Sequence, residues 1–149
     1  MSSASTFKKL IAEMSPMAFS ISLNLYLLNK FNFVVGDGRS MEPTLENNTV
    51  FFVNKTAYRK SKLKRGDVII ATSPIDRETL ICKRITHTEG DEVGGELFGG
   101  EKFVVPKNQV WVEGDNKNHS YDSRAHGPID KVLVQGVVLF KIYPSFQWM

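Results

Sequence analysis

Apolar residues are concentrated near the amino end of the chain and recur farther along in short runs. Between positions 10 and 28, 13 of 19 residues are apolar and Glu13 is the only charged residue. From position 36 onward, apolar and β-branched runs alternate with turn residues, a pattern typical of strands. We therefore divide the chain into an N-terminal segment, residues 1–35, and a second unit, residues 36–149.

The N-terminal segment is compatible with three arrangements. A helix that crosses a bilayer needs about 20 mostly apolar residues, and the run here is interrupted by polar residues such as Ser20, Ser22 and Asn24. We expect a single-pass membrane anchor, with an interfacial helix and an ordinary core helix as alternatives. The first residues are rich in serine, carry Lys8 and Lys9 and contain almost no acidic residue, which is compatible with a mitochondrial targeting signal.

The second unit is predicted to be mainly β. Turn residues separate six apolar runs, and no helical periodicity is evident after residue 36 apart from a possible turn over residues 55–61. The spacing predicts a compact antiparallel β-barrel or sandwich, preceded by one N-terminal helix. The predicted strands cover residues 49–54, 67–72, 80–87, 103–105, 110–113 and 133–142.

Composition excludes several classes of protein. A length of 149 residues suits one domain, and a net charge of +3 without a long basic stripe gives no indication of nucleic-acid binding. Cys82 is the only cysteine, so neither a disulfide framework nor a cysteine zinc site is expected. His87, His119 and His126 do not have the spacing of metal ligands. We therefore expect no metal, no cofactor and no nucleic-acid partner.

Ser40 is the first candidate for chemistry. It follows Gly36 and Gly38 and precedes Pro43. Glycines allow backbone angles that other residues avoid, so this serine could be an exposed nucleophile that a substrate chain can approach. The alternative is an ordinary turn rich in glycine, serine and proline.

Lys83 is the second candidate, because it interrupts an apolar strand pattern. Alternation places it on the same face as Ile81 and Ile85. A lysine at such a position either extends outward to solvent or is held buried. Burial disfavours the ammonium form and lowers the pKa, which would let the amine act as a general base for a serine nucleophile without a histidine.

Four motifs, spread in order over roughly residues 36–143, resemble those of type I signal peptidases. They are Ser40-Met41-x-Pro43-Thr44-Leu45, Lys83-Arg84 ahead of Gly90-Asp91, Gly114-Asp115-Asn116, and Ser120-x-Asp122-Ser123-Arg124 followed by Gly127-Pro128. Within that family the chain is most similar to the mitochondrial inner-membrane branch of subunit 1 type. The features that suggest this branch are Ser73-Pro74, Asn116 and the run Phe140-Lys141-Ile142-Tyr143-Pro144.

The resemblance implies a role for each matched residue. Ser40 corresponds to the nucleophile, Lys83 to the general base, and Ser120 to a serine that orients the lysine. Asp122 and Arg124 correspond to a structural ion pair beside the site. Gly114, Asp115 and Asn116 correspond to a structural segment near the site. Some bacterial relatives supply an oxyanion-hole hydroxyl two residues before the nucleophile, where this chain has Gly38.

The family further implies a membrane-anchored serine endopeptidase. Such an enzyme would cleave sorting or signal peptides from precursors delivered to the mitochondrial intermembrane space. We expect a heterodimer with a sister catalytic subunit, contact with membrane lipid, and a signal-peptidase-like catalytic domain (residues 36–149) on the intermembrane-space side of the inner membrane. The flanking lysines do not decide the orientation.

Two alternatives belong to other classes. Self-cleaving Ser/Lys repressors share the order of the dyad and a related β fold, but this chain has no DNA-binding helical domain and does have the polar segment 114–124, which they lack. A catalytically inactive, membrane-tethered binding subunit would keep the fold without the chemistry. The presence of Ser40, Lys83 and Ser120 argues against it.

Overall fold

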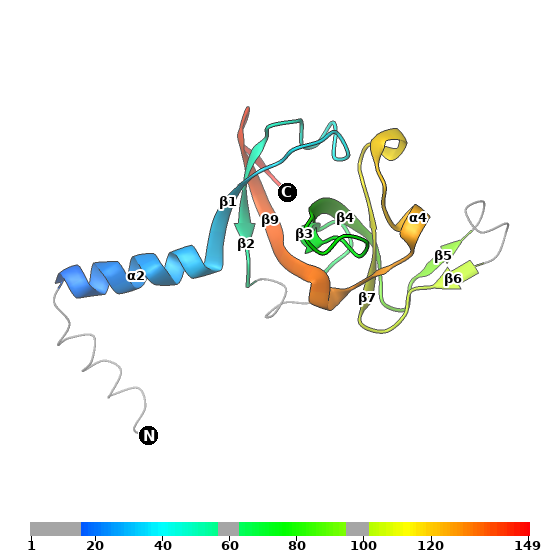
Figure 1. Cartoon of the computed structure of the whole chain (residues 1–149), viewed down its shortest axis with the longest axis horizontal. Helices are drawn as coiled ribbons and strands as arrows, with labels where there is room; N and C mark the ends of the chain where they lie inside the picture. Colours follow the sequence, from blue (N-terminus) through cyan, green and yellow to red (C-terminus); the bar gives the residue numbers. More distant parts are fainter. Residues whose placement is uncertain (1–15, 57–62, 95–101) are drawn as a thin grey trace, which may run out of the picture.

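The computed structural model describes residues 16–56, 63–94 and 102–149 (Figure 1). Residues 57–61 of the possible helical turn, and residues 10–15 of the apolar N-terminal run, lie outside these ranges. Helices are few: α2 covers Pro16–Lys30 and α4 covers Ser123–His126, and single 3₁₀ turns cover Lys117–His119 and Lys131–Leu133.

Strands make up most of the remaining structure, and all six predicted strands are confirmed to within one or two residues. The ten strands of the described part of the chain are β1 (Phe31–Val35), β2 (Val50–Asn54), β3 (Val68–Thr72), β4 (Leu80–Thr88), β5 (Glu92–Gly94), β6 (Lys102–Val104), β7 (Gln109–Glu113), β8 (Ile129–Asp130), β9 (Val134–Tyr143) and β10 (Gln147–Trp148).

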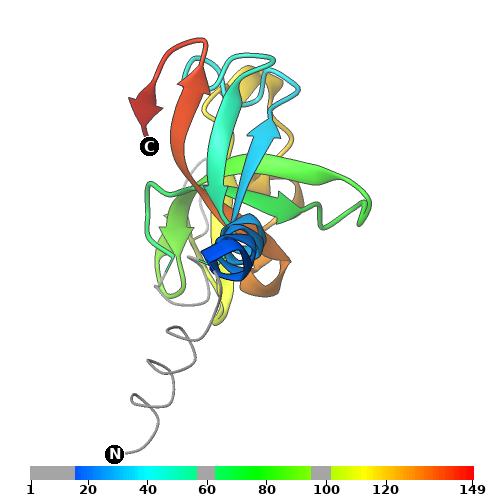
Figure 2. The ribbon, with the colours of Figure 1, turned by 90° about the vertical axis from the view of Figure 1, so that its left-hand side faces the viewer.

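Eight of these strands form one curled sheet. Its order is β1-β2-β9-β3-β4-β7-β8, and β10 pairs with β9. All the pairings are antiparallel, and β5 and β6 form a separate hairpin. The fold is therefore mainly β, as predicted, in the form of a half-barrel that curls without closing (Figure 2).

The sheet begins earlier in the chain than position 36. Residues 31–35, which the sequence pattern grouped with the N-terminal segment, form β1 and pair along their whole length with β2. Aromatic and β-branched residues favour strands, and Val34 packs against the core beneath the sheet. Helix α2 therefore passes into the sheet without a linker and extends away from it (Figure 1).

Helix α2 exposes large apolar side chains around its circumference, among them Met17, Phe19, Ile21, Leu23 and Leu25. Among the helices that the structure describes, none combines the length and the apolar character needed to cross a bilayer.

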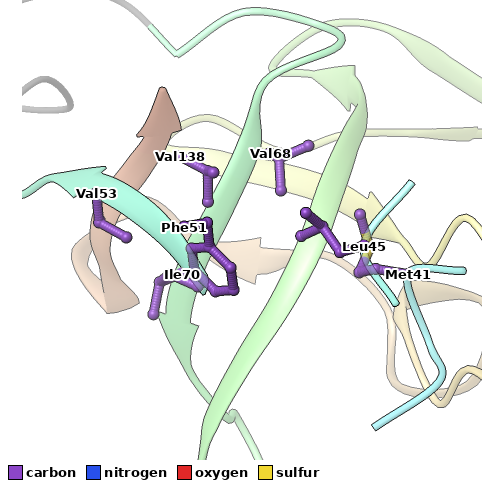
Figure 3. Close-up of a cluster of buried hydrophobic side chains, with 7 residues drawn as sticks. All are labelled: Met41, Leu45, Phe51, Val53, Val68, Ile70 and Val138. Atoms are coloured by element: carbon purple, nitrogen blue, oxygen red, sulfur yellow. The ribbon is translucent and has the colours of Figure 1, made fainter. Parts of the chain in front are cut away.

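The core lies on both faces of the central strand β3. Successive side chains of a strand point to opposite faces, so Val68 and Ile70 enter one cluster while Ile69 and Ala71 enter another. Figure 3 shows the first cluster, which also contains Met41 and other buried residues of the neighbouring strands and turn, namely Leu45, Phe51, Val53 and Val138. A turn that leaves the sheet after β1 is thereby held against the core.

The opposite face of β1, β2 and β9 carries a row of aromatic residues. Phe33 is paired with Phe52, Phe52 with Phe140, and Phe140 with Trp148, so one ring lies on each of four neighbouring strands. The ring centroids of consecutive members are 4.9–5.1 Å apart. We call Phe33, Phe52, Phe140 and Trp148 the aromatic row; its two end members are 66% and 69% exposed.

Candidate active site

The turn that carries Ser40 is fixed by its own residues. Met41 and Leu45 are each 3% exposed and anchor the turn in the first core cluster. The backbone N–H of Leu45 donates to the Met41 carbonyl over 2.9 Å, which closes one helical turn directly after Ser40. Ser40 itself remains partly accessible, so the serine stands at the edge of a rigid turn.

Lys83 lies in the middle of β4 and is 5% exposed, so the outward-pointing alternative does not apply. Burial lowers the pKa of its ammonium below the ordinary value, although Cys82 and Asp122 oppose this effect electrostatically. Lys83 Nζ donates a hydrogen bond to Ser40 Oγ over 2.8 Å. A neutral amine at the same distance can instead accept the proton of the serine hydroxyl, which is the geometry that general-base activation requires.

Gly114 lies where the β4–β7 ladder reaches Lys83 and the Ser40 carbonyl. Arg84 is paired with Glu113, and the same antiparallel register continued by one residue brings Gly114 beside Lys83. A Cβ atom at Gly114 would collide with the Ser120 side chain and with the Ser40 carbonyl. Glycine is therefore the residue that lets three segments of the chain meet at this point.

Asp122 holds the loop behind the site. Its carboxylate is 0% exposed and accepts hydrogen bonds from the Gly114 N–H at 2.9 Å and from Arg124 Nε and Nη2 at 2.8 and 2.9 Å. Burial alone would raise the pKa of this carboxyl, but the hydrogen bonds outweigh it and lower the pKa to about 2. The ion pair expected between Asp122 and Arg124 is present.

Asp115 and Asn116 hold the other side of the serine turn. Asp115 forms a two-point ion pair with Arg84, with distances of 2.8 and 2.7 Å. Burial raises the pKa of Asp115, but hydrogen bonds from Arg84 and Thr44 reverse this and keep it below the ordinary value. The Asn116 N–H donates to the Ser40 carbonyl at 3.0 Å. The sequence motifs contained Arg84 without indicating this ion pair.

Ser120 lies within the site, but its contact with the lysine is not formed. Its hydroxyl oxygen is buried, close enough to Asp122 to favour the ionised form of that carboxyl. In the described part of the chain it nevertheless has no partner at hydrogen-bonding geometry. The orienting role expected from the family motif therefore stays a prediction.

Gly38 has a structural reason to be glycine. Its φ of +107° belongs to a region that other residues rarely adopt, and its N–H donates to Asn47 Oδ1 at 2.9 Å. A serine at this position would be strained, and the N–H of Gly38 already has a partner.

Two further reactive side chains lie close to this arrangement without taking part in the contact between Ser40 and Lys83. Burial raises the pKa of the Cys82 thiol to about 12, which keeps it protonated and a poor nucleophile. Burial also lowers the pKa of His126, whose Nδ1 lies 2.8 Å from the Gly127 carbonyl oxygen. Within residues 16–56, 63–94 and 102–149, no three histidine, cysteine or acidic residues are grouped as metal ligands would be.

A serine, a buried lysine and a loop held by an ion pair thus meet beside strand β4. The chain matches the family model described as "Signal peptidase, peptidase S26" over residues 11–97 and 94–143. It belongs to this family of serine endopeptidases.

Its relatives specify the branch. It is 40% identical over 115 residues to mitochondrial inner membrane protease subunit 1 of Homo sapiens, which covers 74% of this chain and 69% of the relative. It is 32% identical over 149 residues to the protein of the same name in Schizosaccharomyces pombe, covering 98% and 93%. A subunit 2 relative from Danio rerio is 30% identical over 135 residues, covering 87% and 74%.

The Gly114→Ala substitution tests the packing of the site. The added methyl group must displace Ser120 and the Ser40 carbonyl, and such overpacking costs about 1–3 kcal/mol. We expect a lower free energy of unfolding by denaturant titration. The Gly94→Ala variant is the control, because the nearest described atom to a Cβ there is Cγ of the flexible Lys102 side chain, at 3.1 Å. Equal effects of the two substitutions would contradict the proposed fit at Gly114.

Proposed function

We propose that this protein is a membrane-associated serine endopeptidase that uses Ser40 as its nucleophile and Lys83 as its general base. Its substrates are precursor proteins in the mitochondrial intermembrane space, from which it removes sorting or signal peptides. The observation that carries the proposal is the 2.8 Å contact between Lys83 Nζ and Ser40 Oγ at a lysine that is 5% exposed.

The reaction is acyl transfer. Neutral Lys83 takes the proton of the Ser40 hydroxyl while Ser40 Oγ forms a bond to the scissile carbonyl carbon. The resulting tetrahedral intermediate breaks its C–N bond, and Lys83 returns the proton to the leaving amine. Lys83 then removes a proton from water, whose attack on the acyl-enzyme ester releases the carboxylate product and regenerates Ser40.

Three further residues support this chemistry. Asp122 and Arg124 hold the segment that contains Ser120, and we assign Ser120 to orienting the lysine during the reaction. The Ser40 N–H is the first donor of the oxyanion hole in this assignment. The second donor is a group other than a side chain at position 38, since that residue is glycine.

A sister catalytic subunit is the proposed protein partner. Relatives of this chain are named subunit 1 and subunit 2 of the mitochondrial inner membrane protease, and both are similar enough to this chain to share its fold. We therefore propose a heterodimer at the mitochondrial inner membrane, with residues 36–149 as its catalytic domain facing the intermembrane space.

Membrane lipid is the proposed surface partner. Helix α2 exposes apolar side chains all around, and a helix of this kind is suited to an apolar medium rather than to a protein groove. Phe33, one exposed end of the aromatic row, lies on β1, which continues from this helix, and Trp148, the other end, lies on β10, which pairs with β9. Together they support an N-terminal segment anchored through α2, with the sheet that begins at β1 held against the bilayer.

Cleavage of an intermembrane-space precursor by the detergent-solubilised chain, with and without the sister subunit, tests the dyad. We expect Ser40→Ala and Lys83→Ala each to lower kcat/KM by about 10³-fold or more, because the nucleophile and its base act as a unit. The controls are Ser145→Ala and Lys107→Ala, which alter exposed residues of the same types. Cleavage that survives Ser40→Ala would mean that the partner cuts and that this chain is the inactive binding subunit.

The pH dependence of kcat/KM tests the role of Lys83. The base must be neutral, so activity should rise with pH through the pKa of Lys83 and fall as the amine becomes protonated. Because burial lowers that pKa, half-maximal kcat/KM should occur below pH 10.5, the ordinary value for lysine. Activity that continues to rise beyond pH 10.5, with the protein still folded, would contradict the assignment.

Tryptophan fluorescence tests contact with lipid. Trp111 is 0% exposed and Trp148 is 69% exposed, so the two report on different environments. In phosphatidylcholine–cardiolipin vesicles that contain brominated acyl chains, we expect quenching of the fluorescence, and the Trp148→Phe variant should lose that quenching. Emission from Trp148 that is unchanged by brominated lipid would contradict contact between the aromatic row and the bilayer.

A further inference from the structure

Lys141 is a second buried lysine, and the dyad does not use it. It lies near the end of β9 and is 5% exposed. Its neighbour Phe140 belongs to the aromatic row on the outer face, so alternation directs Lys141 to the inner face. There the strand runs beside the turn that follows Ser40, since Lys141 Nζ donates to the Thr44 carbonyl at 3.4 Å.

No acidic partner compensates the Lys141 ammonium. Among the described residues, no carboxylate lies within 4.0 Å of its Nζ, although a buried lysine without a counter-ion costs stability. Its one hydrogen bond goes instead to a backbone carbonyl. The polar contact of Lys141 is therefore with the turn that follows Ser40, and any effect of this lysine on the site acts through that turn.

The acceptor lies at the end of the turn that begins at Ser40. The bond from the Leu45 N–H to the Met41 carbonyl closes that turn, and the Thr44 carbonyl is at its C-terminal end. Backbone carbonyls without a hydrogen-bond partner at such ends carry partial negative charge, and a cation beside them is stabilising. Lys141 thus caps the turn from a strand 97 positions farther along the chain.

The other end of the same turn is held from a different part of the molecule. At the Ser40 end, the Asn116 N–H donates to the Ser40 carbonyl and Lys83 Nζ donates to Ser40 Oγ. Without Lys141, the Thr44 end of the turn would be held by its apolar anchors and by the Thr44 side chain beside Asp115. A shift at Thr44 would then be transmitted to Ser40, only four residues away.

We propose that Lys141 is a positioning residue, which caps the turn of residues 40–45 and so keeps Ser40 Oγ within hydrogen-bonding distance of Lys83 Nζ. Lys141 touches neither the substrate nor the reacting atoms. The role assigned to Ser40 rests on the proposed function, whereas the capping contact does not.

The experiment compares Lys141→Met, Lys141→Arg and the exposed-lysine control Lys107→Met in the full-length, detergent-solubilised chain. Methionine keeps most of the apolar stem and removes the cation. We expect Lys141→Met to lower kcat for precursor cleavage by about 10- to 100-fold with KM within about twofold, since small misplacements of a nucleophile have effects of this size. Lys141→Arg should restore most of the activity, and Lys107→Met should match wild type.

A second readout is the rate at which a small hydroxyl-acylating inhibitor labels Ser40, normalised to folded protein. It should fall in Lys141→Met in parallel with kcat and recover in Lys141→Arg. Labelling at the wild-type rate in Lys141→Met, with cleavage impaired or not, overturns the proposal, because Ser40 would then be correctly placed without the cap. A fall explained entirely by a smaller folded fraction, measured by thermal denaturation, overturns it as well.

Two further outcomes are decided by the same data. If Lys141→Met does not fold, Lys141→Arg decides alone: labelling within about threefold of wild type supports the cap, and a tenfold loss in the folded variant contradicts it. If the wild-type chain cleaves no precursor, the proposed function fails, while the labelling rates still decide the role of Lys141.

Discussion

An amine held away from water beside a serine hydroxyl is the constraint on which the rest of this structure depends. Lys83 can serve as a base only where its charged form is disfavoured, and the interior of a sheet supplies that condition at a cost in stability. Other groups nearby are arranged to remain charged and fully bonded. Asp122 accepts hydrogen bonds from a backbone N–H and an arginine, and Asp115 pairs with Arg84. Lys83, whose charged form burial disfavours, is therefore flanked by ion pairs that stabilise the loops around it.

Much of the fold could be predicted from local pattern. The six predicted strands appear because alternation and turn residues act over a few positions, as in residues 80–87, where Lys83 shares a face with two isoleucines. The candidate residues also came from local signals: glycines before Ser40, and a charged residue inside an apolar run. What those patterns could not decide was whether Lys83 is buried. That depends on β3 and β7 lying on either side of β4, which no single segment reveals.

The features that sequence reasoning missed are those formed by contacts between segments far apart in the chain. β1 was grouped with the apolar N-terminal run because Phe31, Phe33 and Val35 suit a lipid-facing helix as well as a strand, and pairing with β2 decides between them. The bond between Lys141 and the Thr44 carbonyl joins residues 97 positions apart and involves a backbone atom that every residue possesses. Lys141 itself stands in an ordinary-looking strand, where its inward direction follows only from the outward direction of Phe140. The apolar residue beside it, Phe140, was the only indication in the sequence that Lys141 points inward.

The position of β9 in the sheet has a consequence for the order of events during synthesis. β9 lies between β2 and β3, so it joins the part of the sheet that leads to the serine turn to the part that contains the lysine strand. Until residues 134–143 have left the ribosome, each part lacks the strand that aligns it with the other. Ser40 and Lys83 are thus synthesised before the strand that aligns their two parts of the sheet. In a chain that has been synthesised only as far as β8, Ser40 and Lys83 lack the strand that joins their two parts of the sheet.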